Sequence, residues 1–350
     1  MPSQLTSQAN ATALRAWVFA TLLALAGCAT TSQPIVLNGE GLGATWSVKL
    51  AEPPAHSNEE IRTGVQQRVD EVARQLSRWD AQSSLGQLNN SKTQDWQPLP
   101  PTLFSALSFA LRLAPDTGGA YDPTVAPLVD AWGFGIAGRR FDPPATEAIE
   151  AAQKRVGWAK VELDESMQRV RRPSGMQIDL SSMTHGLAAD EVAIYLRSRG
   201  IDRYFIDVGS EIRAAGLSHQ NQAWRVGVER PPEEASSDGV QSTPLRVVAL
   251  RDAGIATSGN YRYYFDFGGR RYSHRLDPRT GAPITHPLAS VTVIDPQCAH
   301  ADALATALTV LGPDEGLDYA RRHDIAALFV VRTPQGVEER MTPQFAAYLD

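Results

Sequence analysis

Residues 273–281 read Ser-His-Arg-Leu-Asp-Pro-Arg-Thr-Gly and follow a segment with the composition of a β-strand. Proline and glycine favour a turn here, so the stretch places the His274 imidazole and the Asp277 carboxylate just after a strand. A second stretch, 300–306, reads His-Ala-Asp-Ala-Leu-Ala-Thr and favours a helix. Asp302 and Thr306 are four residues apart, so they share a helix face and can offer two oxygens to one point. Oxygen ligands beside an imidazole suit magnesium and phosphate chemistry better than zinc chemistry.

Each stretch taken alone also has a structural interpretation. Residues 273–281 could form a capped turn, in which Asp277 braces the backbone rather than reacting. Asp302 and Thr306 could be polar residues near the start of a helix with no role in binding or catalysis. The functional interpretation depends on the two stretches occurring together.

The rest of the chain predicts an α+β fold, because its strands follow one another in hairpins more often than they alternate with helices. Gly268-Gly269, for example, joins two strand-like segments. We expect mixed, largely antiparallel sheets with flanking helices, in one domain or two intimate subdomains, and a polar loop over 79–90. Helices are expected at 57–78, 101–113, 145–156, 187–199, 299–311 and 317–322, and strands at 44–50, 161–163, 170–172, 176–180, 204–208, 211–215, 247–250, 254–257, 262–267, 270–274, 289–294 and 326–331.

The composition is that of an ordinary globular protein. The chain has 350 residues, of which 43% are hydrophobic and 21% charged, enough to form a sizeable core. Lys and Arg number 33 against 39 Asp and Glu, a net charge of −6 that argues against a nucleic-acid-binding protein. An anionic ligand therefore needs local cationic or metal help.

The N-terminus has the pattern of a targeting signal. Arg15 precedes an apolar run, 16–25, that is too short to span a bilayer and ends in Leu25-Ala-Gly-Cys28, which looks like a bacterial lipobox. We expect a signal peptide over 1–27, a lipid-anchored tether over 28–40 and one domain over 41–350; an ordinary cleaved signal with a chance cysteine is the alternative. Without Asp at position 29, the outer membrane is slightly favoured over the inner. With Cys28 lipidated, Cys298 has no disulfide partner and is expected to be buried.

Seven motifs, in this order, resemble the ApbE family of FAD:protein FMN transferases, which are often bacterial lipoproteins. The likeness covers nearly all of the mature chain, and it implies transfer of the FMN half of FAD to a Thr or Ser hydroxyl of a partner protein, with release of AMP and dependence on Mg²⁺. The motifs are YDPTVAPLVDAWGFG (121–135), IDLSSMTHGLAAD (178–190), DVGSEIRAAG (207–216), IATSGNYR (255–262), YSHRLDPRTGAP (272–283), SVTV (290–293) and ADALATAL (301–308).

The resemblance also assigns roles to residues. It implies that Mg²⁺ is held by Asp302, Thr306 and the backbone carbonyl of Ser182, and it makes His274 the candidate base for the acceptor hydroxyl, or else a group that orients the phosphate. The implied FAD contacts are Leu42, Trp79, Ala120, Tyr121, Asp122, Asp179, His185 and Leu276, with Asn89 and Thr257 as weaker candidates.

Three positions depart from the common pattern of the family. Leu42 stands where Met is usual, which keeps an apolar contact. Ser181-Ser182 replaces a frequent Gly-Gly, and His185 replaces a frequent Lys, which removes a fixed positive charge near the phosphates at neutral pH. FAD affinity or its pH dependence is therefore expected to differ.

Two other functions fit the same motifs. An Mg²⁺-dependent FAD pyrophosphatase would use water as acceptor and release FMN and AMP, whereas a lipid-anchored FAD-binding protein would need neither metal nor base. The resemblance further implies that the acceptor is a respiratory or periplasmic redox subunit, and that the chain is anchored on the periplasmic side of the cell envelope.

Overall fold

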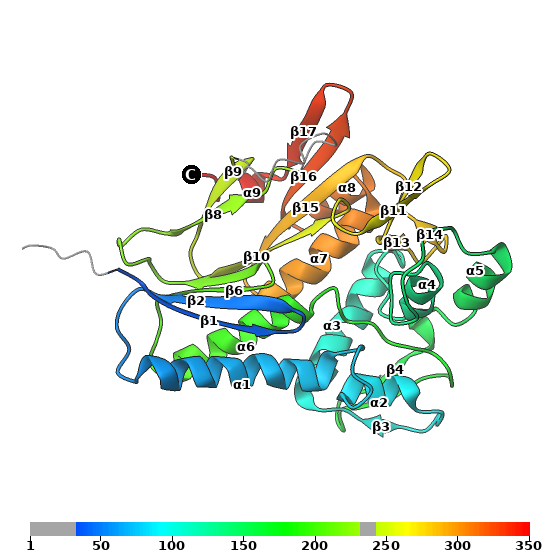
Figure 1. The fold of residues 1–350 in the computed structure, drawn as a ribbon, viewed down its shortest axis with the longest axis horizontal. Coiled ribbons are helices and arrows are strands. Elements are labelled where there is room, and N and C mark those ends of the chain that lie inside the picture. Colours follow the sequence, from blue (N-terminus) through cyan, green and yellow to red (C-terminus); the bar gives the residue numbers. More distant parts are fainter. Residues whose placement is uncertain (1–32, 232–242) are drawn as a thin grey trace, which may run out of the picture. The chain divides into compact units, whose positions relative to one another are not determined.

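An eight-stranded sheet forms the centre of the fold in the computed structural model, which describes residues 33–231 and 243–350 (Figure 1). Every neighbouring pair in this sheet is antiparallel. In spatial order the strands are β1 (Ile35–Gly41), β2 (Ala44–Leu50), β6 (Tyr204–Val208), β7 (Glu211–Ala215), β10 (Ala253–Gly259), β15 (Leu288–Asp295), β16 (Ala326–Thr333) and β17 (Gly336–Met341).

Helices α1 (Asn58–Leu76), α6 (Thr184–Ser198) and α7 (Cys298–Leu311) pack on one face of this sheet and form the larger core with it (Figure 1). Helix α1 starts at Ser57, whose hydroxyl accepts a hydrogen bond from Glu60 N at 3.2 Å. Its buried apolar residues recur at helical spacing, so one stripe faces the core. Helix α7 is buried nearly all round, because it lies between the sheet and α6.

The opposite face of the sheet is covered by a hairpin and the C-terminal helix. Strands β8 (Trp224–Val228) and β9 (Arg246–Leu250) pair with each other, and α9 (Pro343–Ala346) packs near β16. Their apolar side chains form a second core with the sheet, in which the rings of Phe205 and Trp224 lie 5.6 Å apart.

The remaining elements form the end of the molecule that carries the loops. Leu128, Trp132, Phe265 and Leu276 share a third apolar cluster, which joins a helical segment to the turn at 273–281. The elements here are α2 (Ser84–Asn90), β3 (Gln97–Pro98), α3 (Pro101–Asp116), α4 (Ala126–Ala131), α5 (Thr146–Gln153), the 3-10 helix η1 (Trp158–Lys160), β4 (Glu162–Asp164), β5 (Arg169–Arg171), β11 (Tyr264–Phe267), β12 (Arg270–Ser273), β13 (Leu276–Asp277) and β14 (Ala282–Pro283). Helix α8 (Glu315–Arg322) instead packs against α7 and β16.

The predicted fold class is confirmed, with corrections to single elements. Residues Pro34–Asp350 form one compact unit. Strand β1 pairs with β2 from Ile35 onward, so the end of the expected tether belongs to the sheet. Residues 84–90 form helix α2 rather than a loop, because Ser83 accepts a hydrogen bond from Gly86 N at 2.8 Å and begins the helix.

Residues 176–180 were expected to be a strand, and this expectation is wrong. Met176, Ile178 and Leu180 are buried at alternate positions, which explains the strand-like pattern. Their backbone instead bonds to a helix side chain and a loop. Ile178 N donates to the side chain of Asn89 in α2 at 2.7 Å, and Asp179 N donates to the Pro123 carbonyl, also at 2.7 Å.

The expected signal peptide and Cys28 lie outside the described residues. Cys298 is a free, buried cysteine, as predicted. Among the helices of the described residues, none has the length and apolar character needed to cross a membrane.

Candidate active site

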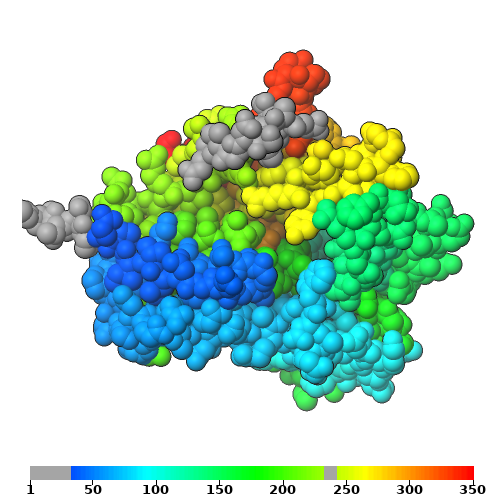
Figure 2. Space-filling view, viewed as in Figure 1, coloured from blue at the N-terminus to red at the C-terminus, as the bar shows by residue number. Residues whose placement is uncertain are grey.

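Five separate segments of the chain line one cavity at the loop end of the molecule. It holds about 880 Å³ of empty space, counting the part that opens to solvent, and Figure 2 shows the surface hollowed where these differently coloured segments meet. The lining comes from the end of α1 (78–79), the segment around α4 (120–134), the loop 179–182, the turn 274–278 and α7 (306 and 310).

Most of the residues implied by the motifs meet in this first cavity. Leu42 and His185 line an adjoining cavity that shares Arg78, Trp79 and Ser181 with the first. Asn89 instead bonds the backbone of Ile178, and Thr257 lines another cavity. The expected residues that line the first cavity are Trp79, Ala120, Tyr121, Asp122, Asp179, Ser182, His274, Leu276 and Thr306.

The turn at 273–281 holds His274 in one orientation. Backbone N–H groups of Thr280 and Gly281 donate to the Asp277 carbonyl at 3.2 and 2.9 Å, and the Asp277 carboxylate accepts from Arg279 N at 2.9 Å. Asp277 therefore braces the turn, as expected. His274 Nδ1 lies 2.8 Å from the backbone carbonyl of Tyr263.

A carbonyl can only accept a hydrogen bond, so Nδ1 of His274 carries the proton of the neutral ring. Nε2 is then left with a free lone pair, as a general base requires. Burial, with the charge of Arg275 beside it, lowers the pKa of His274 to about 3. The imidazole is therefore neutral at physiological pH.

Asp302 and Thr306 lie on buried α7 and both interact with Arg275. Asp302 is only 8% exposed and accepts one hydrogen bond, from Gly186 N at 3.3 Å. Burial raises the pKa of Asp302 to about 7, opposed by the nearby charge of Arg275. Thr306 Oγ1 lies 3.0 Å from Ser258 Oγ and accepts from Arg275 at 3.3 Å.

This donor set suits magnesium better than a transition metal. A buried carboxylate with a single hydrogen bond, the hydroxyl of Thr306 and a backbone carbonyl at Ser182 are all oxygen ligands, which Mg²⁺ prefers. In the described residues, no three His, Cys, Asp or Glu side chains cluster as a metal site. The protein would therefore supply only part of an octahedron, leaving the other positions to water and substrate phosphate.

Two charged residues at this site were not expected from the sequence. Burial lowers the pKa of Arg275, although the carboxylates of Asp302 and Glu211 oppose that shift. Burial and the charge of Asp302 raise the pKa of Glu211 well above its ordinary value. Arg275 adjoins His274 in the motif, but its position between two carboxylates depends on segments far apart in the sequence.

A buried ion cluster holds the wall that carries Trp79. Arg78, with a side chain only 3% exposed, donates to Asp130 at 3.0 Å and to Asp179 at 3.0 Å. Asp179 also accepts from Ser181 N, and Asp122 accepts from Thr124 N at 2.7 Å. Both expected FAD contacts, Asp122 and Asp179, thus also brace the loops of the cavity.

The chain matches the model of the ApbE family over residues 42–329. The chain belongs to the ApbE family. It is 34% identical to the FAD:protein FMN transferase of Vibrio cholerae, over 96% of this chain and 99% of that protein, and 32% identical to that of Escherichia coli K12, over 96% and 97%.

Solved structures of ApbE proteins agree in fold. The flavin transferase ApbE from Vibrio cholerae has a TM-score of 0.83 at 32% identity, covering 91% of this chain and 99% of that one. The flavinyl transferase ApbE of Pseudomonas stutzeri has a TM-score of 0.81 at 34% identity, covering 90% and 96%.

Two departures from the usual ApbE pattern meet in the adjoining cavity. Leu42 lies in the β1–β2 turn with φ of 56°, a left-handed conformation that non-glycine residues rarely adopt. Its carbonyl lies 3.2 Å from His185 Nε2, which therefore donates to it. Burial lowers the pKa of His185, so this residue is neutral and does not supply the charge of the lysine it replaces.

Proposed function

We propose that this chain transfers the FMN half of FAD to a Thr or Ser hydroxyl of a partner protein and releases AMP. The observation that carries this proposal is the meeting of three groups in one cavity of an ApbE protein. These are a neutral imidazole with a free Nε2, a buried guanidinium and the Thr306 hydroxyl of α7, with Asp302 four residues before Thr306 on the same helix. A flavin-storage protein would need none of them.

The reaction follows from the positions of these groups. The acceptor oxygen attacks the phosphorus of the FMN half and forms a new P–O ester bond, while the P–O bond to AMP breaks. AMP leaves with the bridging oxygen, and the hydroxyl proton moves to Nε2 of His274. Arg275 supports the negative charge that builds up on the phosphate oxygens.

Residues Asp302 and Thr306, with the carbonyl of Ser182, would hold Mg²⁺. When bound, this ion would neutralise charge on the diphosphate as the bond to AMP weakens. Because the protein supplies few ligands, metal and FAD are expected to bind together rather than independently.

The pKa of His274 in the empty cavity is too low for an efficient base at neutral pH. Burial and Arg275 both favour the neutral ring. A bound diphosphate brings negative charge close to the imidazole and so raises its pKa. Base strength is therefore expected to develop only after FAD binds, which limits proton transfer in the empty enzyme.

One incubation separates the candidate functions. The mature protein is mixed with FAD, Mg²⁺ and a candidate acceptor, and AMP, FMN and acceptor-bound flavin are measured. Flavin on the acceptor with one AMP per label supports transfer. Free FMN with AMP would indicate the pyrophosphatase, and unchanged FAD would indicate a binding protein.

The metal assignment predicts the behaviour of Asp302→Ala. Removing the carboxylate should abolish Mg²⁺-dependent turnover, because no other carboxylate is assigned as a ligand. The matched control is Asp318→Ala on α8, whose side chain is 74% exposed and away from this cavity. If Asp302→Ala keeps the wild-type rate at equal magnesium, the metal site lies elsewhere.

We also propose that the chain is lipid-anchored through Cys28 on the periplasmic side of the envelope, with a redox subunit as acceptor. The lipobox pattern of residues 25–28 supports the anchor. A membrane-held transferase would meet membrane-bound or periplasmic acceptors at raised local concentration.

A further inference from the structure

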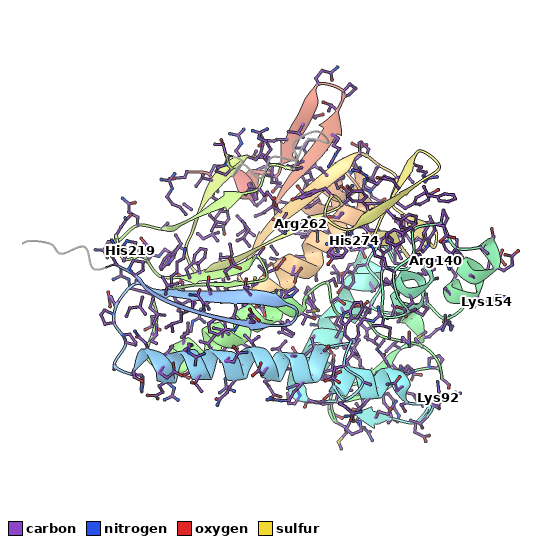
Figure 3. The ribbon with its side chains drawn as sticks, in the orientation of Figure 1. Lys92, Arg140, Lys154, His219, Arg262 and His274 are labelled. Atoms are coloured by element: carbon purple, nitrogen blue, oxygen red, sulfur yellow. The ribbon has the colours of Figure 1, made fainter. Side chains whose placement is uncertain are left out.

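A second cavity lies next to the first, and of the residues implied to contact FAD only His185 and the weaker candidate Thr257 line it. It holds about 1360 Å³ of empty space, counting the part open to solvent, and shares His274 and Arg275 with the first cavity. Its walls come from the start of β7, the strands β8 and β10, and residues 259–263. Arg262, at its rim, and His274 are both labelled in Figure 3.

Among the described residues, the end of strand β10 has no pairing partner on the edge along this cavity. It pairs with β15 from Gly254 to Gly259, but β7 covers only Ala253–Ile255 on the other side. Strand β7 cannot extend further, because Gly209 and Ser210 turn the chain away with φ of 64° and 85°. The last part of β10 therefore lies beyond the end of its neighbour.

The backbone groups of Thr257 and Gly259 point toward this gap. Asn260 N donates to Ala289 O at 3.0 Å, which shows that residue 260 faces β15. Backbone groups alternate along an antiparallel strand, so those of Thr257 and Gly259 face the opposite side. Ile255, Thr257 and Gly259 also line the cavity, whereas the Ser258 side chain lies on the α7 side and bonds Thr306 at 3.0 Å.

The same cavity contains an unsatisfied polar group. Oε2 of Glu211 is buried and has no hydrogen-bond partner among the described residues. Buried polar atoms are nearly always bonded, so this oxygen is free to pair with a polar group of a ligand. At the rim, Tyr263 is 65% exposed and packs against the His274 ring, with 5.8 Å between the ring centres.

We propose that the second cavity binds the acceptor protein as an extended segment that pairs with the open edge of β10 and presents its hydroxyl to His274. The proposal rests on the function proposed above. An open strand edge of this kind accepts an added strand through main-chain hydrogen bonds. FAD and acceptor would approach His274 from different cavities, which suits an in-line displacement with attacking and leaving oxygens on opposite sides.

Peptides test this directly. The probe is a mixture of ten-residue peptides with one central Thr and randomised flanks, incubated with the enzyme, FAD and Mg²⁺, and labelled peptides are identified by flavin fluorescence. Gly259→Pro removes an N–H that faces the cavity, whereas Gly259→Ala keeps it and adds similar bulk beside Tyr261. We expect Gly259→Pro to lower kcat/KM for a labelled peptide about tenfold relative to Gly259→Ala, at equal FAD affinity.

A scan on the peptide itself avoids any effect of the variant on folding. Each backbone nitrogen of a labelled peptide is methylated in turn, and strand pairing predicts that labelling by the wild type is lost at every second position. The absence of this period, with equal rates for the two variants, overturns strand pairing.

The outcomes also separate this inference from the proposed function. Cleavage of FAD by water without labelled peptide overturns docking of an extended segment but leaves the FAD site intact. FAD that stays uncleaved in the presence of Mg²⁺ and peptides overturns the proposed function, and this inference with it.

Discussion

His274 has two ring nitrogens with different roles, and this division determines the chemistry at the residue scale. Nδ1 donates to the Tyr263 carbonyl and fixes the tautomer, while Nε2 keeps the free lone pair that the proposed base needs. A backbone carbonyl, rather than a carboxylate, holds the ring and stabilises the imidazolium only weakly. A bound diphosphate would therefore be the main source of basicity.

The first prediction concerns His274→Ala. We expect kcat for flavin transfer to fall about 10²- to 10⁴-fold, the usual contribution of a general base, while the Kd for FAD changes little. Transfer is followed by flavin fluorescence of the acceptor and Kd by titration. His219→Ala is the control, since Figure 3 places His219 far along the sheet from His274. Equal losses in kcat and FAD affinity would make His274 a binding residue instead.

The sequence predicted most residues of the first cavity but not the contacts that organise them. The resemblance to the family grouped His274, Asp179, Ser182 and Thr306 in one site, although the sequence itself does not show how far apart they lie. Arg78 was missed, because its partners Asp130 and Asp179 lie 52 and 101 residues away. Ion pairs between residues so far apart leave no local sequence pattern. The spacing of residues therefore does not predict them.

At the scale of elements, α7 carries the two side chains proposed to hold the metal, and its start is tightly held. Asp190 on α6 accepts hydrogen bonds from Cys298 N at 3.1 Å and Ala299 N at 2.9 Å, and pairs with Arg213 at 3.4 Å. A carboxylate suits the positive end of a helix dipole. Helices α6 and α7 are thereby fixed relative to each other.

Asp190 predicts a pH dependence of stability. Burial raises its pKa to about 6 from 3.8, so between these values the native state binds more protons than the unfolded state. Stability from this group therefore falls as pH rises through that window, by about 3 kcal/mol in total. Urea unfolding at several pH values measures it. The free energy of wild type minus that of Asp190→Asn should decline from pH 4 to 7; a flat or rising difference contradicts the assignment.

Gly186 of α6 lies at a close contact with the start of α7. A Cβ at this position would lie 2.4 Å from the Cys298 carbonyl oxygen, so Gly186→Ala must push α7 away from α6. We expect a loss of about 1–3 kcal/mol in unfolding free energy. Because Gly186 N also bonds Asp302, we further expect a higher Mg²⁺ concentration at half-maximal rate. Ile194→Ala, on the exposed side of α6, is the control. Equal stability of the two variants would show that the contact is not tight.

Elements were predicted best where their pattern was periodic. Helix α1 and strand β15 ended within a few residues of expectation, because periodic burial marks each of them. Strands β8 and β17 were missed, since half of β8 faces solvent and β17 is an edge strand with few buried residues. Residues 176–180 alternate in burial without a neighbouring strand to pair with, which sequence alone does not reveal.

At the scale of the folded unit, three adjoining cavities surround the turn at 273–281 and the start of α6. The first and second share His274, and the second and the one beside Leu42 share His185. This arrangement would give FAD and acceptor the separate approaches to His274 that we propose. Strand β10 of the large antiparallel sheet connects the two cavities. Near its end, Ser258 bonds Thr306 of α7, and the edge of the same segment faces the second cavity.

Lipid anchoring through Cys28 predicts that loss of this residue changes where the protein is found but not its rate of catalysis. Cys28→Ala should release the protein from the membrane fraction, because the lipid attachment site is lost, while kcat of the released protein toward a peptide acceptor stays within about twofold of the wild type. Fractionation and the mass of the mature N-terminus measure this. Membrane association that survives the substitution would contradict anchoring through Cys28.

The most direct test of the central claim is the position of metal and dinucleotide in a crystal soaked with FAD and Mn²⁺, located by anomalous scattering. The account predicts a metal peak between Asp302 and Thr306, with diphosphate oxygens completing its coordination and His274 Nε2 facing the FMN phosphorus. A crystal with FAD bound but no metal beside α7, or with the diphosphate far from His274, would contradict it.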